Sequence, residues 1–442
     1  MPVPDNLRSR FLAGFTPPDL PPESRRAFRF HMAYAVLDAV KDGILANTPL
    51  MAVKAMAASD AQLQIPLVTS SLGFLASVFM GVAMATRHKK PFIVVPGLLS
   101  ALAMLGMAST SSAVLFLCAS GLVSIFEFAM RPAVPSILRI VYPNYSRSHV
   151  AGTLRQYASI VFLGSSLLFA SLLTASGRQI HTMIRVELIL AGLASLSAYL
   201  CFQRLPDRGD GSAAEALPPE AQAEGTWREK YGQISMAPLR DARFRRFLSI
   251  LFIFNCGNLF YMGIVPSYFA NDLKFGYVSA TLFIHVIPAV AGFLLGGRFT
   301  AWFDRTSVWR SYGLVLLFWG ADPTLLAIAP FLLPVVVLAR VLRGPATVGS
   351  MVLAVYTGVH RFAKPGPDTS CYMSALFLVN GFARLVSPSL SAVAVGYLGH
   401  RGILLVGGLA TLTASALFFR EASRSAREET IQPEAETAVA VP

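Results

Sequence analysis

The sequence predicts an all-α, polytopic membrane protein with 12 transmembrane helices, arranged as two six-helix pseudo-symmetric halves. Of its 442 residues, 54% are hydrophobic and only 14% are charged, whereas soluble domains carry about a quarter charged residues. Apolar stretches of about 20 residues recur along the chain, and each is long enough to cross about 30 Å of hydrocarbon as a helix. One long polar stretch divides these segments into two sets of equal size, which indicates an internal repeat.

The predicted spans are separated by short polar segments, such as HKKP at 88–91 and FDRTSVWR at 303–310. In the first half they are residues 30–52, 62–86, 91–109, 112–138, 152–174 and 182–203. In the second half they are residues 246–270, 277–302, 309–329, 331–356, 371–396 and 402–419.

The polar stretches set the predicted domain boundaries. The central stretch is rich in Ala, Pro, Glu and Arg, a composition typical of a linker. The predicted segments are a cytoplasmic N-terminal tail (1–27), an N-terminal six-helix half (28–203), a cytoplasmic linker (204–244), a C-terminal six-helix half (245–421) and a cytoplasmic C-terminal tail (422–442).

The distribution of basic residues predicts the orientation. With the N-terminus inside, about 26 of the 37 Lys and Arg residues fall on the cytoplasmic side and about 5 on the other. Both termini are then cytoplasmic, and the net charge of +13 needs no nucleic-acid partner to explain it. The Ala-, Arg- and Gly-rich composition favours a bacterial inner (plasma) membrane.

Enzyme signatures are missing from the sequence. It contains no Walker loop, no HExxH and no G-x-S-x-G, and its four cysteines lack metal-ligand spacing. We therefore expect no enzymatic activity, no cofactor and no metal site. An ion gradient is the remaining ordinary source of energy for transport.

The first predicted span contains three charged residues, in VLDAVKDGILAN at 36–47. A charge in hydrocarbon costs several kcal/mol when it has no partner. Asp38 and Asp42 share a helix face, Lys41 is three residues from Asp38, and the face continues toward Asn47. Two interpretations stay open: a self-neutralising structural pair of Asp38 with Lys41, or a carboxyl group at Asp38 or Asp42 that takes up a proton during transport.

The fourth span contains FEFAMRPAVP, in which Glu127 and Arg131 have the i, i+4 spacing of a helical ion pair. This pair is either structural or part of a site. Pro132 and Pro135 should bend or interrupt the helix, and broken helices form binding sites in transporters.

The seventh span carries a polar stripe of Asn255, Asn258 and Tyr261 at three-residue spacing. Asparagine amides either join neighbouring helices or bind a solute. Both interpretations stay open for this stripe.

Three arginines lie in later spans: Arg340 and Arg343 in the tenth and Arg384 in the eleventh. They must pair with acids or face water, and Asp322 and Glu127 are possible partners. The spans then hold four acids against five bases, which favours a substrate with an anionic group.

The loop after the second span, GVAMATRHKK, resembles the G-x-x-x-D-R-x-G-R-R pattern of the major facilitator superfamily of secondary transporters. Gly81, Lys89 and Lys90 match, whereas Ala85 stands for the acid. The equivalent loop of the second half, TAWFDRTSVWR, keeps pattern residues that the first loop lacks.

In that second loop Asp304 and Arg305 match and Thr300 replaces the glycine. Together with the six-plus-six arrangement, the resemblance covers roughly residues 28 to 421. The residues of these two loops, Gly81, Lys89, Lys90, Asp304 and Arg305, are implied to form cytoplasmic contacts that bias one conformation.

The resemblance implies a secondary active transporter that moves a small solute by alternating access with proton coupling, and the surplus of bases favours an anionic solute. The implied partners are a small-molecule substrate, the lipid bilayer and a proton or other coupling ion, with the chain acting as a monomer. The implied substrate and proton site consists of Asp38, Lys41, Asp42, Asn47, Glu127, Arg131, Asn255, Asn258, Tyr261, Arg340 and Arg384. Because both loops depart from the pattern, an alternative stays open, in which a transporter-shaped membrane protein serves as an assembly or binding factor.

Overall fold

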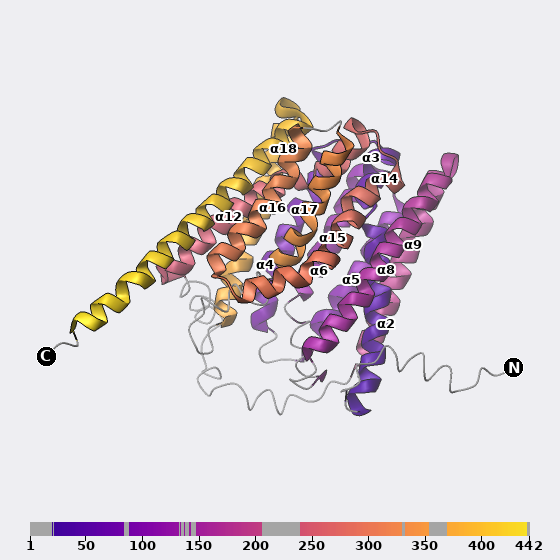
Figure 1. The fold of residues 1–442 in the computed structure, drawn as a ribbon. Coiled ribbons are helices and arrows are strands. Elements are labelled where there is room, and N and C mark those ends of the chain that lie inside the picture. Colours follow the sequence, from indigo (N-terminus) through magenta and orange to yellow (C-terminus); the bar gives the residue numbers. More distant parts are fainter. Residues whose placement is uncertain are drawn as a thin grey trace. The chain divides into compact units, whose positions relative to one another are not determined.

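The structure is a computed structural model that describes residues 20, 22–83, 88–131, 133, 137, 141–142, 147–205, 239–328, 332–352 and 369–439. These residues form helices and turns, and they contain no strand (Figure 1). The predicted all-α class is therefore confirmed. Nine helical stretches within the described ranges have the length and apolar composition needed to cross a membrane.

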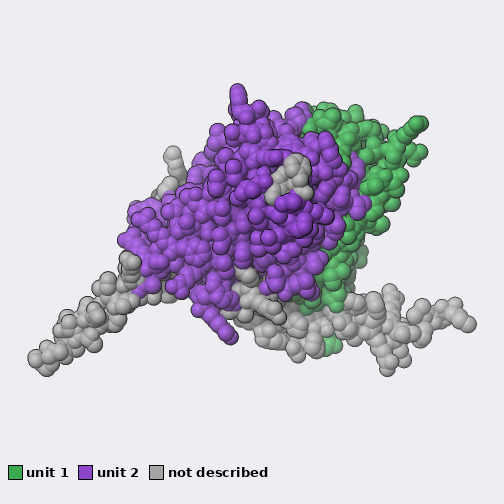
Figure 2. All heavy atoms as spheres, turned by 45° about the horizontal axis from the view of Figure 1, so that its top comes forward, with its two compact units in different colours: residues 1–58, 72–225 green, residues 59–71, 226–442 purple. Residues whose placement is uncertain are grey.

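The chain divides into two compact units (Figure 2). Unit 1 consists of residues 1–58 and 72–225, and unit 2 consists of residues 59–71 and 226–442. The short segment 59–71 therefore belongs by its contacts to unit 2, although the chain before and after it belongs to unit 1.

Unit 1 is built from long helices that follow one another along the chain. They are α2 (Pro22–Leu45), α3 (Thr48–Met56), the larger part of α4 (Ile65–Ala83), α5 (Pro91–Ser109), α6 (Ala113–Met130), α8 (Arg147–Ala175) and α9 (Ile180–Gln203). Helix α2 packs against α8 and α9, and α5 packs against α6 and α9.

Unit 2 contains the remaining helices and the start of α4. They are the 3-10 turn η1 (Gln62–Gln64), α12 (Ala242–Met262), α13 (Val265–Ser267), the π-helical turn η4 (Tyr268–Asp272), α14 (Tyr277–Thr281), the π-helical turn η5 (Leu282–Val286), α15 (Ile287–Asp304), α16 (Val308–Ile328), α17 (Leu333–Val352) and α18 (Thr369–Val439). Helix α18 consists of two helices, because Gly399 interrupts it with φ of 62° and ψ of 177°.

The helices of the two units pack in the same order. In unit 1 the first long helix contacts the fifth and sixth, and the third contacts the fourth and sixth. In unit 2, α12 and α16 both pack on α18, which holds the last two spans, and α16 also packs on α17. This repeated order is the expected result of a structural repeat.

The helix of the second span crosses close to the helix of the fourth span, and the eighth crosses close to the tenth in the same way. A Cβ atom on Gly73 of α4 would lie 2.7 Å from the carbonyl oxygen of Ile125 in α6. In unit 2 the backbones of α15 and α17 meet at Gly292 and Gly344, where a Cβ atom on either glycine would collide with the facing backbone. Small residues allow such close contacts between membrane helices.

Two sequence features interrupt the first and fourth predicted spans. Helix α2 ends at Leu45, and α3 begins at Thr48 with proline in its first turn, so the span 30–52 is two helices joined at Asn47. Helix α6 ends at Met130, directly before Arg131 and Pro132. Proline lacks the backbone N–H that would continue a helix, which explains the second interruption.

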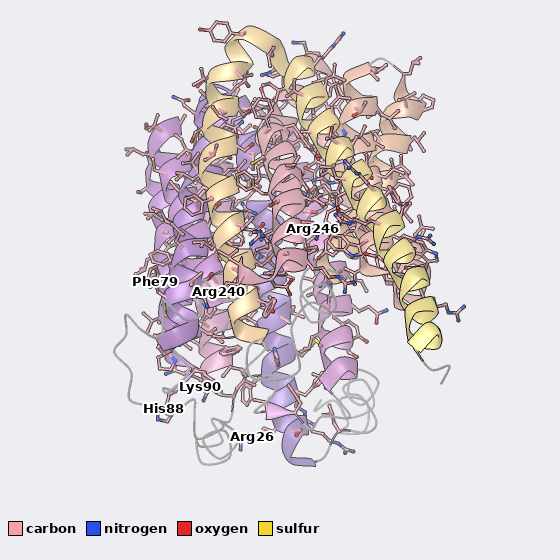
Figure 3. All side chains as sticks on the ribbon, turned by 90° about the vertical axis from the view of Figure 1, so that its left-hand side faces the viewer. Arg26, Phe79, His88, Lys90, Arg240 and Arg246 are labelled. Carbon is pink, nitrogen blue, oxygen red and sulfur yellow. The ribbon has the colours of Figure 1, made fainter. Side chains whose placement is uncertain are left out.

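Large apolar side chains cover the outer faces of the helices. They include Leu102, Ile160 and Leu168 in unit 1 and Phe293 and Leu294 in unit 2, each more than half exposed. A soluble protein would bury such residues, whereas a bilayer solvates them. Basic side chains lie instead near helix ends: Arg26, His88 and Lys90 in unit 1, and Arg240 and Arg246 in unit 2 (Figure 3).

Candidate functional site

The charges of the first span meet in one cluster of unit 1, the acid–lysine cluster of Asp38, Lys41, Asp42 and Glu127. The Lys41 Nζ lies 2.8 Å from Asp38 Oδ1, 3.1 Å from Asp42 Oδ1 and 2.6 Å from Glu127 Oε1. Asp38, Lys41 and Asp42 lie on consecutive turns of α2, and Glu127 reaches them from the last turn of α6. The cluster therefore joins two helices that are far apart in the sequence.

The four side chains differ in their exposure. Lys41 is 2% exposed, whereas Asp38, Glu127 and Asp42 are 23%, 26% and 47% exposed. Three carboxylates surround one ammonium group, and Arg131 interacts electrostatically with Glu127 and Asp42, so one negative charge remains over. Partial exposure gives water access to these carboxylates, and a buried cation beneath them lowers the cost of keeping them ionised.

Two further predicted site residues, Arg131 and Asn47, follow α6 and α2 directly or closely in the chain. The guanidinium carbon of Arg131 stands 4.2 Å from the centre of the Phe128 ring, and its charge interacts with those of Glu127 and Asp42. Asn47 is fully buried, and its amide donates to the carbonyl oxygen of Ser166 in α8 at 3.1 Å. Asn47 thus holds the break between α2 and α3 against α8.

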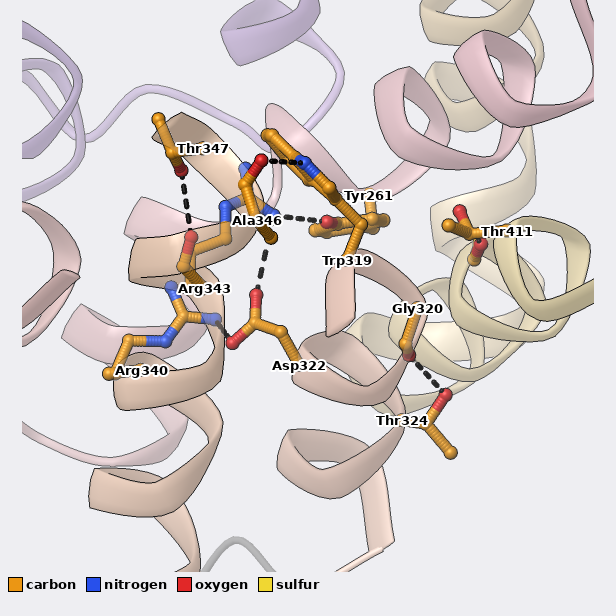
Figure 4. A network of polar contacts seen from close by, with 11 residues as sticks. Tyr261, Trp319, Gly320, Asp322, Thr324, Arg340, Arg343, Ala346, Thr347 and Thr411 are labelled. Atoms are coloured by element: carbon orange, nitrogen blue, oxygen red, sulfur yellow. Dashed lines mark hydrogen bonds and ion pairs between the residues drawn. The ribbon is translucent and has the colours of Figure 1, made fainter. Parts of the chain in front are cut away.

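Unit 2 contains an arginine–aspartate cluster made of Tyr261, Trp319, Asp322, Arg340 and Arg343 (Figure 4). Asp322 is fully buried and forms ion pairs with both arginines, through Oδ1 to Arg340 and through Oδ2 to Arg343 Nη1 at 3.3 Å. The sequence named Asp322 as a possible partner of these arginines, and the structure brings them together. Two guanidinium groups share one carboxylate, so one positive charge remains over.

Arg343 is the more accessible of the two arginines. Its side chain is 13% exposed and that of Arg340 is 3% exposed. The Arg343 guanidinium lies 3.5 Å from the centre of a Trp319 ring and donates to the Tyr261 hydroxyl. Trp319 is itself fixed by a hydrogen bond from its Nε1 to the Ala346 carbonyl at 2.9 Å. Trp319 carries no charge and lies in an apolar span, so its sequence position did not mark it as a site residue.

The asparagine stripe lies on α12, the helix that also carries Tyr261. Asn255 and Asn258 are both partly buried. The Asn255 Nδ2 and the Asn258 Oδ1 have no hydrogen-bond partner among the described residues. The third stripe residue, Tyr261, belongs to the arginine–aspartate cluster. The stripe therefore places two amide atoms with unused hydrogen-bonding capacity one helical turn apart.

Corresponding helices carry the two clusters. In unit 1 the first helix contacts the fourth through Lys41 and Glu127. In unit 2 the seventh helix contacts the tenth through Tyr261 and Arg343. The internal repeat thus places a polar side-chain link between equivalent helices of each unit.

Arg384, another predicted site residue, lies on α18, where its guanidinium donates to the Ser70 hydroxyl at 3.2 Å. The predicted loop residues Lys89 and Lys90 precede α5, and their carbonyls accept backbone hydrogen bonds from its first turn. Arg305 directly follows α15 and is exposed. The surroundings of Gly81 in α4 and the side chain of Asp304 in α15 lie outside what the structure describes, as do most of the 1–27 tail and of the 204–244 linker.

A third polar cluster, the histidine clamp of Asp60, Asp272 and His400, was not predicted. His400 Nδ1 lies 2.6 Å from Asp272 Oδ1, and Nε2 lies 2.9 Å from Asp60 Oδ2. These residues lie in three turns: before η1, at the end of η4 and directly after Gly399. Each residue lies in a separate short turn, and nothing in the sequence indicates that these three turns meet.

The Major Facilitator Superfamily profile matches residues 31–329. Among solved structures, a mutant of the nucleoside transporter NupG has a TM-score of 0.68 and 16% identity, covering 89% of this chain and 99% of its own. A POT family transporter in complex with a thioalcohol-conjugated peptide has a TM-score of 0.70 and 12% identity, covering 90% and 96%. The human organic anion transporter MFSD10 has a TM-score of 0.60 and 16% identity, covering 90% and 100%. No curated protein sequence matches the chain.

Proposed function

The chain belongs to the Major Facilitator Superfamily, and we propose that it is a proton-coupled secondary active transporter that moves a small solute by alternating access. Its fold is shared with transporters, and its apolar helices make it an integral membrane protein. In this mechanism, two helix sets rock about a site near the middle of the bilayer. We place both termini in the cytoplasm, on the side where basic side chains gather at the helix ends.

The observation that carries the proposal is the position of Lys41 among three carboxylates. A purely structural ion pair needs one carboxylate for each ammonium group. Lys41 and the nearby Arg131 together balance two of the three carboxylates, so one carboxylate is in excess, and Asp42 is the most exposed of the three. A proton arriving from water therefore neutralises an uncompensated charge rather than breaking the only ion pair of Lys41.

The position of the cluster couples this proton to the helices. Lys41 lies on α2 and Glu127 on α6, so the Lys41–Glu127 contact ties the first helix to the fourth. A proton on Glu127 would remove the negative charge that holds Lys41 to α6. A proton on Asp42 would leave Lys41 paired with Asp38 and Glu127 and would strengthen the tie. Asp42 is therefore our proposed proton-binding residue, and Glu127 connects its charge state to helix packing.

The arginine–aspartate cluster supports a substrate with an anionic group. Asp322 neutralises one of its two arginines, and Arg343 is held by Trp319 and Tyr261 in a fixed orientation. A fixed guanidinium group can bind a carboxylate or phosphate through two parallel hydrogen bonds. Asn255 and Asn258 would supply further hydrogen bonds to the solute. The related structures are described as transporters of nucleosides, peptides and organic anions, so the fold alone does not select among these classes.

The experiment has two stages, both with the full-length protein. A thermal-shift screen of the purified protein first compares uridine, dialanine and succinate, each at several pH values. The solute that raises the melting temperature is then offered to proteoliposomes that contain a pH-sensitive dye. We expect solute uptake to be driven by an inward proton gradient and to acidify the lumen.

The matched variants are Asp42→Asn and Asp38→Asn. We expect Asp42→Asn to retain solute binding and folding but to lose proton-driven uptake. Unchanged proton-driven uptake in both variants would contradict the assignment of the proton site. Binding without any transport by the wild-type protein would favour the alternative of an assembly or binding factor.

A further inference from the structure

Glu187 of α9 is a buried acid that the proposed transport site does not use. Its side chain is fully buried, and neither Oε1 nor Oε2 has a hydrogen-bond partner among the described residues. The neighbouring side chains of Val186 and Ile189 are 44% and 43% exposed, so they face lipid while Glu187 points into unit 1. An ionised carboxylate that is buried without a partner is strongly unfavourable. A proton or a cation must therefore balance this group.

Aromatic contacts between α2 and α9 fix what lies level with Glu187. The ring centre of Tyr34 lies 5.7 Å from that of Tyr199 and 4.9 Å from that of Phe202. Helices α2 and α9 run antiparallel, because successive spans alternate in direction. Positions 46 and 49 lie 12 and 15 residues after Tyr34, and Glu187 lies 12 and 15 residues before Tyr199 and Phe202. Since both helices rise 1.5 Å per residue, Glu187 is level with the break between α2 and α3.

The same contacts show which side of α9 carries Glu187. Glu187 and Phe202 are 15 residues apart, slightly more than four turns of 3.6 residues, so their side chains leave the helix within about 60° of each other. Phe202 packs on α2 through Tyr34, and α9 contacts both α2 and α3. Glu187 therefore faces the broken part of the first span.

The break supplies oxygen atoms with unused bonding capacity. Thr48 is 3% exposed, and its hydroxyl oxygen has no hydrogen-bond partner among the described residues. In a continuous helix the Leu45 carbonyl would accept a hydrogen bond from the N–H of residue 49, but Pro49 has no N–H. Backbone carbonyls at such helix breaks coordinate Na⁺ or protons in transporters. A carboxylate, a hydroxyl and a carbonyl group thus lie at one level of unit 1.

The charged side chains near this level have no hydrogen bond or ion pair with Glu187 within the described part of the chain. Lys41 of α2 is surrounded by the acids of its own cluster, including Asp42, the acid of α2 closest to the break. Arg185 of α9 and Lys54 of α3 are exposed. The charge of Glu187 is therefore not balanced by any of these basic residues.

We propose that Glu187, Thr48 and the Leu45 carbonyl form a binding site for Na⁺. Hard cations take several oxygen ligands, so one ion would balance the carboxylate and use the free capacity of the hydroxyl at the same time. The ligands come from both sides of the helix break and from α9, so the bound ion would hold these three segments together. The site shares no side chain with the acid–lysine cluster, and Na⁺ binding here does not rest on the proposed proton-coupled transport.

The test is thermal denaturation of the purified full-length protein at pH 7, in NaCl or in choline chloride of equal ionic strength. We expect Na⁺ to raise the melting temperature of the wild-type protein with a saturable dependence on concentration. Glu187→Gln should lose this response and should be no less stable than the wild type in choline chloride, because the neutral amide removes the unbalanced charge. Thr48→Val keeps the side-chain shape and should raise the half-saturating Na⁺ concentration about tenfold, the order expected for losing one contact to a charged group.

The matched control is Glu127→Gln, the same substitution in the acid–lysine cluster, which should keep the Na⁺ response. Equal melting temperatures of the wild-type protein in the two salts would overturn the proposal and leave a proton to balance Glu187. A Na⁺ response that survives Glu187→Gln, or that Glu127→Gln removes, would overturn it as well. If Glu187→Gln does not fold, Thr48→Val decides, and an unchanged half-saturating concentration would then overturn the proposal. The experiment contains no solute and no proton gradient, so its result is independent of whether the protein transports anything.

Discussion

The Lys41 ammonium lies 2.6 Å from the Glu127 carboxylate, across 86 residues of sequence. This contact turns three charges of one helix into a link between α2 and α6. Its energetic consequences can be measured without knowledge of the substrate.

Removing the buried cation should be strongly destabilising. Lys41→Met leaves three carboxylates close together without their ammonium partner, which should lower the free energy of unfolding by about 3–5 kcal/mol. Thermal denaturation in detergent at pH 7 measures the loss. Glu127→Gln is the milder comparison, because Lys41 keeps Asp38 and Asp42. A Lys41→Met protein as stable as Glu127→Gln would contradict the central role of this ammonium.

The two arginines of unit 2 should respond differently to removal of their shared partner. Asp322→Asn leaves Arg340, which is 3% exposed, without a carboxylate, and should cost about 3–5 kcal/mol of unfolding free energy. Arg343→Met should cost less, because the Asp322–Arg340 pair remains. Chemical or thermal unfolding followed by tryptophan fluorescence measures both. A larger loss in Arg343→Met would show that its stacking on Trp319 outweighs the ion pair.

Stability should fall at alkaline pH through His400. Its hydrogen bonds, mainly that to Asp60, raise its pKa to about 9, so the stabilisation is complete below the ordinary histidine pKa of about 6.5 and is lost as the pH rises through about 9. The melting temperature of the wild-type protein should therefore decline between about pH 6.5 and 9 by more than that of His400→Gln. Parallel curves for the two proteins would contradict the contribution of the clamp.

The close crossing of α15 and α17 should not tolerate a methyl group. In Gly344→Ala the new Cβ would overlap the Pro288 carbonyl and the Gly292 backbone, so the helices must separate and the melting temperature should fall. Gly106→Ala is the matched control, because a Cβ there meets nothing within 4 Å. Alanine should even stabilise that helix by up to about 1 kcal/mol. Equal melting temperatures for the two variants would contradict this close packing.

The sequence predicted the class of fold because membrane helices carry a strong local signal. Length and apolar composition are properties of each segment alone, and the spacing of Asp38 and Lys41 already offered their contact as one of two interpretations. Long-range partners carry no such signal. The i, i+4 spacing indicated that Glu127 interacts with Arg131, but it gave no sign that the folded chain also brings the Lys41 ammonium to Glu127.

The histidine clamp shows the same limit more strongly. Asp60 and His400 are 340 residues apart and lie in short turns, where neither periodicity nor hydropathy indicates a partner. The packing of η1 on α18 brings them together. The sequence did not indicate a role for Trp319 for a different reason. An aromatic residue in an apolar span is typical of ordinary core packing.

The left-handed backbone at Gly399, with φ of 62° and ψ of 177°, constrains how this region can evolve. That conformation is nearly restricted to glycine, and His400 is the very next residue. A side chain at position 399 would force the turn into another path and carry the imidazole away from both acids. Selection on the shape of a hairpin between two lipid-embedded helices is therefore also selection on the ionic bond beside it, and the two traits are inherited together.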